Sequence, residues 1–120
     1  MATAPTLTVV LPVYNEEALL PELHRRLVAA LGPLALPYEL LYVDDGSSDR
    51  SLEVLTGLAR EDPRVGVLSL SRNFGHQMAL TAGLDHARGE AVILMDSDLQ
   101  DPPELIPELV ARWREGLDVV

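Results

Sequence analysis

Short apolar runs alternate with longer amphipathic segments along the whole chain, and this alternation limits the folds that it can adopt. The runs are rich in valine, leucine and isoleucine, as strands buried on both faces are. They cover residues 7–13, 39–43, 65–70 and 91–95. The segments between them place apolar residues at helical spacing, as at Leu20, Leu23 and Leu27. We therefore predict a three-layer, Rossmann-like α/β fold whose sheet is mostly parallel and carries helices on both faces.

The later helices are marked by different signals. Residues 52–58 carry a leucine stripe, whereas residues 78–87 are rich in small side chains. The last helix has the clearest start, because Asp101 can cap it and Glu104 stands three positions further on. It is expected to end near Glu115. A chain of 120 residues that is 48% hydrophobic can form one domain with a buried core.

Composition excludes several classes of function. The formal charge of −10 opposes nonspecific binding to nucleic acid or to anionic membranes. Cysteine and lysine are both absent, which rules out thiolate chemistry, Schiff bases and the lysine-dependent phosphate loop. No apolar run approaches the ~18 residues of a membrane span, and no signal peptide is recognisable. From these features we expect a cytoplasmic protein.

The stretch "AVILMDSDLQDPPE" crowds three aspartates behind an apolar run. Carboxylates this close repel one another unless a cation lies among them. Asp101 is assigned to the helix cap, but Asp96 and Asp98 cap nothing obvious, and we predict that they bind a metal. Ser97 between them lets both carboxylates approach one ion, and Gln100 can add a neutral oxygen. Oxygen ligands suit Mg²⁺ or Mn²⁺.

Similar polar clusters follow each of the four predicted strands: "PVYNEE", "VDDGSSD", "SRNFGH" and "MDSDLQD". Ligands of open α/β sheets bind beyond the carboxyl ends of the strands, so these loops should form one rim. Its acids are Glu16, Asp44, Asp45, Asp96 and Asp98. Two structural alternatives remain open. Residues 15–17 could only cap a helix, and "DDGSSD" could be only a turn followed by a capping Asp49. A metal in an acidic rim would bridge the protein to phosphates, which indicates a nucleotide-diphosphate site.

The segments "VVLPVYNEE", "VDDGSSDRS", "SLSRNFGHQMALTAGLDHARG" and "MDSDLQDPPELI" resemble family 2 glycosyltransferases. Within that family they are most similar to polyprenyl-phosphate glycosyltransferases, such as dolichol-phosphate mannose synthases and undecaprenyl-phosphate sugar transferases. The resemblance implies a nucleotide-sugar-binding fold of the GT-A type. It also implies that residues 1–120 are the donor-binding half of a catalytic domain. This half is truncated after the fourth strand and the following helix, and the acceptor half of the domain is absent.

The resemblance also assigns roles to individual residues. Pro12, Tyr14 and Glu16 would line the nucleotide pocket, with Val43 and Asp45 beside the base and ribose. The aspartate pair of the family would be Asp96 and Asp98, with Gln100 completing the metal and diphosphate contacts. Ser97 stands where alanine is common and should leave the metal site intact. The residues expected to face the sugar or the acceptor phosphate are Arg72, Asn73 and His76, and the catalytic assignments are Asp98 and Arg72.

The implied reaction transfers a sugar, with inversion, from a UDP- or GDP-linked donor to a polyprenyl phosphate, using Mg²⁺ or Mn²⁺ at the cytoplasmic face of a membrane. A receiver domain is a poor alternative, because it needs a lysine on the rim. A noncatalytic nucleotide-binding fragment and a family 2 enzyme with a sugar-hydroxyl acceptor remain open, as do the sugar and the nucleotide. An exposed sheet edge would favour homo-oligomers.

Overall fold

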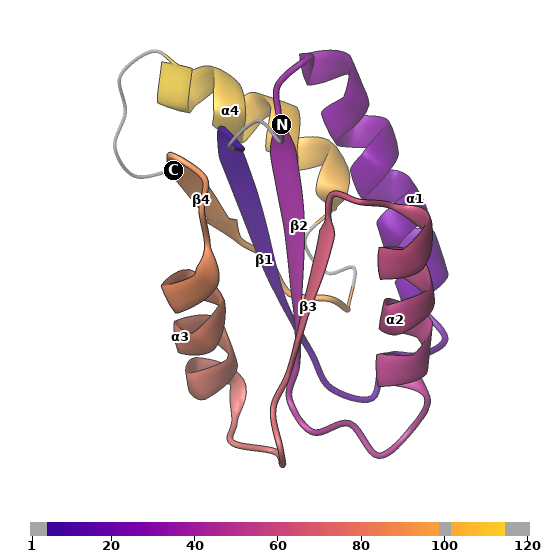
Figure 1. The fold of residues 1–120 in the computed structure, drawn as a ribbon. Helices are drawn as coiled ribbons and strands as arrows, with labels where there is room; N and C mark the ends of the chain where they lie inside the picture. Colours follow the sequence, from indigo (N-terminus) through magenta and orange to yellow (C-terminus); the bar gives the residue numbers. More distant parts are fainter. Residues whose placement is uncertain (1–4, 99–101, 115–120) are drawn as a thin grey trace.

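The computed structural model describes residues 5–98 and 102–114 of the chain. Strands and helices alternate in the order expected from the sequence (Figure 1). The strands are β1 (Leu7–Val13), β2 (Tyr38–Asp44), β3 (Val65–Ser69) and β4 (Ala91–Leu94). The helices are α1 (Leu20–Leu31), α2 (Ser51–Glu61), α3 (His76–His86) and α4 (Ile106–Arg114), and the 3₁₀ turns are η1 (Gly32–Leu34) and η2 (Pro103–Leu105). Among the described helices, none is long and apolar enough to cross a membrane.

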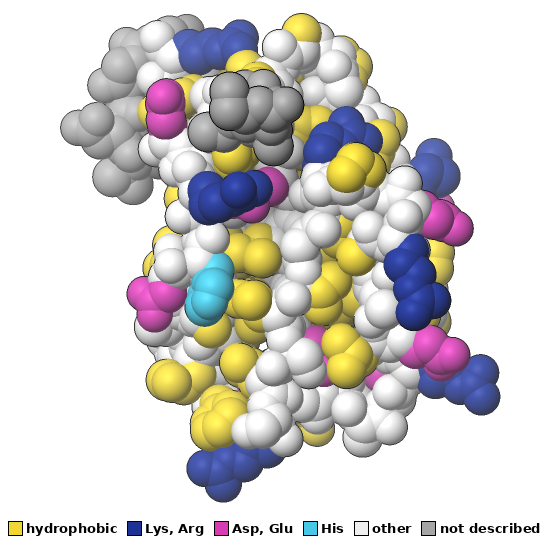
Figure 2. Space-filling view, viewed as in Figure 1, with side chains coloured by type: hydrophobic (Ala, Val, Ile, Leu, Met, Phe, Trp, Pro, Cys, Tyr) yellow, Lys and Arg dark blue, Asp and Glu magenta, His cyan; other side chains and the backbone are white. Residues whose placement is uncertain are grey.

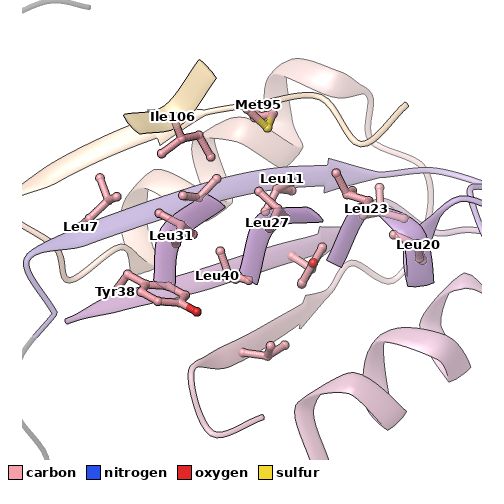
Figure 3. Close-up of a cluster of buried hydrophobic side chains, with 14 of the residues drawn as sticks. Leu7, Leu11, Leu20, Leu23, Leu27, Leu31, Tyr38, Leu40, Met95 and Ile106 are labelled. Carbon is pink, nitrogen blue, oxygen red and sulfur yellow. The ribbon is translucent and has the colours of Figure 1, made fainter. Parts of the chain in front are cut away.

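The helices cover both faces of the sheet, which confirms the predicted three-layer α/β fold (Figure 1). Alternate residues of β1 point to opposite faces. On one face, Leu11 joins the larger core cluster with side chains of α1, α2 and α4. On the other face, Val10 packs against α3. The larger cluster, shown in Figure 3, includes Leu7, Leu20, Leu23, Leu27, Leu31, Tyr38, Leu40, Met95 and Ile106.

All four strands are parallel and lie in the order β3-β2-β1-β4. The chain therefore builds outward from β1 to β3 and then returns to place β4 on the other side of β1. This reversal leaves a crevice beyond the carboxyl ends of β1 and β4, where open α/β sheets bind ligands. β1 also continues to Val13, whereas its pairing with β4 ends at Val10 and Leu94, so the two strands end at different heights.

Two helix boundaries differ from the sequence prediction. α3 begins at His76, two residues before the predicted start, and Gly75 before it makes no side-chain cap because it has no side chain. The last helix starts with the 3₁₀ turn η2 before α4 begins at Ile106. The predicted Asp101 cap and the predicted end near Glu115 lie outside the described residues.

α3 approaches the sheet closely because Gly83 has no side chain. A Cβ atom added at Gly83 would lie 2.3 Å from Cγ1 of Val10. Val10 is fully buried and β-branched, so its side chain has little freedom to turn away. The position of α3 over β1 and β2 therefore depends on this glycine, and α3 in turn carries His76 to the edge of the crevice.

Candidate functional site

A cavity of about 410 Å³ lies beyond the carboxyl ends of the strands, at the reversal of strand order. All four strand-end loops line it, the loop after β2 through Asp45. The lining residues are Pro12, Val13, Tyr14, Glu16, Asp45, Asn73, Gly75, His76, Asp96, Ser97 and Asp98. The polar clusters that follow the four strands therefore meet at one edge of the sheet, because parallel strands bring all their carboxyl ends to one side.

Acidic side chains gather on one side of this cavity. Asp96 and Asp98 follow β4, and buried Ser97 separates them. Partial burial raises the pKa of Glu16, and the nearby carboxylates of Asp98 and Asp49 raise it further. The acids from β1 and β4 are therefore close enough to repel one another, and a cation would relieve this repulsion.

The donor atoms present fit a magnesium or manganese ion that is completed by a ligand. Carboxylates are the ligands that these ions prefer, and Mg²⁺ in particular is often held by one or two of them plus phosphate oxygens. In the described parts of the chain, no group of three His, Cys, Asp or Glu side chains could by itself hold a metal. Asp96 and Asp98 would therefore hold the ion together with a bound diphosphate, while Gln100 lies outside the described residues.

Asp96 contacts a histidine from another element. Nε2 of His76 lies 2.7 Å from Oδ1 of Asp96, and His76 is the first residue of α3. An ionised carboxylate only accepts hydrogen bonds, so Nε2 of His76 must carry the proton and donate it. Both side chains line the cavity, so this pair joins the start of α3 to the end of β4.

Asp45 lies at the inner wall of the cavity, 4% exposed. Its Oδ1 accepts the N–H of Phe74 at 2.8 Å, and its Oδ2 accepts the N–H of Gly75 at 3.1 Å. Asp45 thus holds the loop between β3 and α3. Each carboxylate oxygen has a second lone pair, so a ligand in the cavity could still bond to Asp45.

The loop after β2 is in close backbone contact with the loop after β3. Gly46 has a φ of +70°, and a Cβ atom there would lie 2.3 Å from the carbonyl carbon of Arg72 and 2.4 Å from the backbone nitrogen of Asn73. Only glycine meets both requirements at this position. The glycine in "VDDGSSD" is therefore required by the approach of two loops as well as by the turn itself.

Asn15 ties the loop after β1 to the loop after β2. Its backbone is left-handed, with a φ of 53°. Its side-chain oxygen accepts the N–H of Ser48 at 2.8 Å and of Asp49 at 3.2 Å, while its own N–H donates to Oγ of Ser47 at 2.9 Å. Asn15 therefore bridges two loops and does not cap α1, whose N-cap Leu19 makes no side-chain cap hydrogen bond.

Asp49 and Ser51 extend this link between the two loops. The N–H of Glu16 donates to Oγ of Ser51, and that of Glu17 donates to Oδ2 of Asp49. Asp49 also accepts the N–H of Ser51, the first residue of α2, although the N-cap position is Arg50, which makes no side-chain cap hydrogen bond. Ser51 has no role that the sequence alone predicts, because its partner Glu16 is 35 positions away.

Not every predicted site residue reaches the cavity. Val43 is fully buried and packs under α3, and Arg72 is exposed with its guanidinium 4.7 Å from the ring centre of Phe74. Asp44 is buried in β2 and does not line the cavity. The lining residues Val13 and Gly75 were not predicted from the sequence, because Val13 has an apolar side chain and Gly75 has none, so neither gives a chemical signal.

Comparison with known proteins places this chain in a family. The sequence profile described as "Glycosyl transferase family 2" matches residues 8–120. The chain belongs to glycosyl transferase family 2. It is 51% identical over 113 residues to YkcC, an uncharacterized glycosyltransferase of Bacillus subtilis. The matched region covers 94% of this chain and 35% of YkcC. It is 52% identical over 114 residues to the undecaprenyl-phosphate 4-deoxy-4-formamido-L-arabinose transferase of Pseudomonas paraeruginosa. Here the matched region covers 94% of this chain and 34% of the transferase.

Two solved structures share the fold. TarS of S. aureus in complex with UDP-GlcNAc superposes with a TM-score of 0.74 at 27% identity, over 92% of this chain and 31% of that one. The mannosyltransferase PcManGT of Pyrobaculum calidifontis, in complex with GDP-Man and Mn²⁺, gives a TM-score of 0.69 at 28% identity, over 80% and 28%. These matches confirm the GT-A-type fold. The chain spans about a third of the length of the curated relatives it matches.

Proposed function

We propose that this chain is the donor-binding part of an enzyme that transfers a sugar, with inversion, from a nucleotide diphosphate to a polyprenyl phosphate. The observation that carries the proposal is the cavity at the strand-order reversal, which is lined by Asp96, Asp98, Tyr14 and Glu16. The polyprenyl-phosphate acceptor is supported by the 52% identity to an undecaprenyl-phosphate arabinose transferase.

The residues of the cavity suit different parts of the donor. Asp96 and Asp98 would hold a Mg²⁺ or Mn²⁺ ion, and this ion would neutralise the negative charge on the departing diphosphate. Tyr14 is 46% exposed at the end of β1 and offers a ring face to the nucleoside. Asp45, on the inner wall of the cavity, would accept a hydrogen bond from the base or the ribose.

Catalysis would then depend on positioning and charge. The proposed acceptor is a phosphate, which is already an oxyanion, so a strong general base is less necessary than for a hydroxyl acceptor. The chain would hold the donor with its diphosphate over Asp96 and Asp98, where charge develops as the sugar leaves. We propose that the polyprenyl phosphate is bound by parts of the enzyme outside these 120 residues.

Calorimetry of nucleotide binding tests the donor site. UDP and GDP are titrated in the presence of Mn²⁺ into the wild-type chain, Asp96→Asn and Asp98→Asn. Each substitution is expected to weaken binding about tenfold or more, because a neutral amide is a poor ligand for a hard cation. Asp85→Asn on the exposed surface of α3 is the matched control and should bind as the wild type does. Unchanged affinity in both site variants, with circular dichroism showing them folded, would remove the metal-site assignment.

A radiolabelled transfer assay tests the division between donor and acceptor sites. The full-length enzyme is expected to form lipid-linked sugar from a UDP- or GDP-linked donor and polyprenyl phosphate. The 120-residue chain is expected to bind nucleotide and to form no such product. Robust product from the chain alone would show that the acceptor site lies within it.

A further inference from the structure

We propose that His76 is a positioning residue that orients Asp96 for the metal ion, an inference that rests on the proposed metal-binding role of Asp96. The Nε2–H of His76 donates to Oδ1 of Asp96 at 2.7 Å. The two residues are 20 positions apart and belong to different elements, so the sequence does not bring them together. The hydrogen bond leaves Oδ2 of Asp96 available to a cation.

Asp45 holds the loop that leads into His76. Both carboxylate oxygens of Asp45 accept backbone N–H groups, those of Phe74 and Gly75, the two residues before His76. Oδ1 of Asn73 accepts the same Gly75 N–H at 2.9 Å. Gly75 has a φ of +100°, a backbone conformation that residues other than glycine rarely adopt, and it turns the chain directly into α3.

Close packing against Gly46 also restricts the loop. The Arg72–Asn73 peptide lies against Gly46, where even a Cβ atom would collide with it. A connected path therefore runs from Asp45 at the end of β2, through the loop and His76, to Asp96 after β4. The ends of two strands on opposite sides of β1 are coupled in this way.

The chemical effect is to restrict the orientation of a metal-binding carboxylate. Hydrogen bonds to ligating carboxylates fix their rotamers, and removing such a partner typically lowers metal affinity by about 10–100-fold. His76 and Asp96 have side chains that are 58% and 46% exposed. An exposed pair contributes little to folding stability. A substitution at His76 should therefore change metal binding with little change in the unfolding temperature.

Mn²⁺ binding, followed by the loss of the free-ion electron paramagnetic resonance signal, measures this effect without a transfer assay. Mn²⁺ is titrated alone and with UDP or GDP into the wild type, His76→Ala and His76→Gln. His76→Ala is expected to bind Mn²⁺ about 10–100-fold more weakly at an unchanged unfolding temperature. His76→Gln should recover most of the affinity, because its amide N–H replaces Nε2–H. His86→Ala, at the other end of α3, is the matched control and should bind as the wild type does.

Asp96→Asn, titrated in parallel, separates the two proposals. Loss of Mn²⁺ binding in Asp96→Asn together with unchanged binding in His76→Ala would overturn the role of His76 and leave the metal site standing. Equal weakening in His76→Ala and His76→Gln would also overturn it, because the donated hydrogen bond would then not be the cause. Unchanged Mn²⁺ binding in Asp96→Asn would overturn the metal site itself.

Discussion

His24 is a largely buried histidine that belongs to none of the loops at the cavity. Its Nδ1 lies 3.0 Å from the hydroxyl of Tyr42, and its Nε2 lies 3.5 Å from Oδ2 of Asp62. The Asp62 carboxylate also accepts two hydrogen bonds from the Arg64 side chain. The side chains of His24 and Asp62 are only 13% and 11% exposed. This group of side chains links α1, β2 and the turn between α2 and β3.

Burial is the largest effect on the pKa of His24 and lowers it, the Asp62 carboxylate acts to raise it, and the net shift of the pKa is downward. Between the usual histidine pKa of about 6.5 and the lowered folded value, the unfolded chain binds more protons than the folded chain. The free energy of unfolding should therefore fall as the pH decreases through about 6.5. Arg64 contributes hydrogen bonds that hold the pKa of Asp62 low even though burial acts to raise it, so Asp62 affects stability only in more acidic solution.

We predict that His24→Gln makes stability less dependent on pH. Urea unfolding at pH 7.5 and 5.5 should show the wild type losing more free energy of unfolding than the variant. The difference should be at most about 1.4 kcal/mol, the linkage of one proton over the one pH unit below 6.5. Exposed His86→Gln should keep the wild-type dependence. Equal slopes in the wild type and His24→Gln would show that His24 titrates normally in the folded state.

At the scale of the elements, two glycines inside helices allow a matched comparison. Gly57 in α2 has open space around an added Cβ, whereas Gly83 in α3 would place a Cβ 2.3 Å from Val10. We predict that Gly57→Ala stabilises the chain by about 0.5–1 kcal/mol, because alanine favours the helix. Gly83→Ala should destabilise it by about 1–3 kcal/mol despite the same propensity, because the close packing must open. Denaturant unfolding measures both, and a stabilising Gly83→Ala would mean that α3 lies further from β1.

The strands were predictable to within one residue at each end, because buried parallel strands give nearly continuous apolar runs. The start of α3 was not, because it depends on Asp45 accepting backbone N–H groups about 30 positions away. The candidate site was likewise predictable only where the signal is local in the sequence. The aspartate pair could be selected from its spacing, whereas the contact of His76 with Asp96 and the burial of Val43 under α3 exist only in the folded chain.

At the scale of the whole molecule, the described sheet exposes apolar side chains at β4, which lies at its edge. Val92 and Leu94 are 38% and 48% exposed, and Leu84 of neighbouring α3 is 47% exposed. α3 packs mainly on β1 and β2 and leaves this part of the face open. Figure 2, which has the view of Figure 1, shows hydrophobic side chains at the surface around α3 and β4.

We predict that the 120-residue chain self-associates through β4 as its concentration rises, since an unpaired apolar edge strand can pair with another. The double substitution Val92→Lys and Leu94→Lys should raise the dissociation constant about tenfold or more, the equivalent of at least ~1.4 kcal/mol. Light scattering after size-exclusion chromatography measures it. Leu52→Lys on α2, where Leu52 is 37% exposed, is the control. Association that persists in the double variant would assign the contact to another surface.

The bridge made by Asn15 has a kinetic consequence for the proposed nucleotide binding. Because Asn15 joins the loops after β1 and β2, much of the pocket wall is already ordered before a ligand arrives. Binding then does not wait for these loops to close, and the association rate constant should exceed that of a site whose loops must first rearrange. Discrimination between donors would consequently be expressed in residence time, through how long each one stays bound.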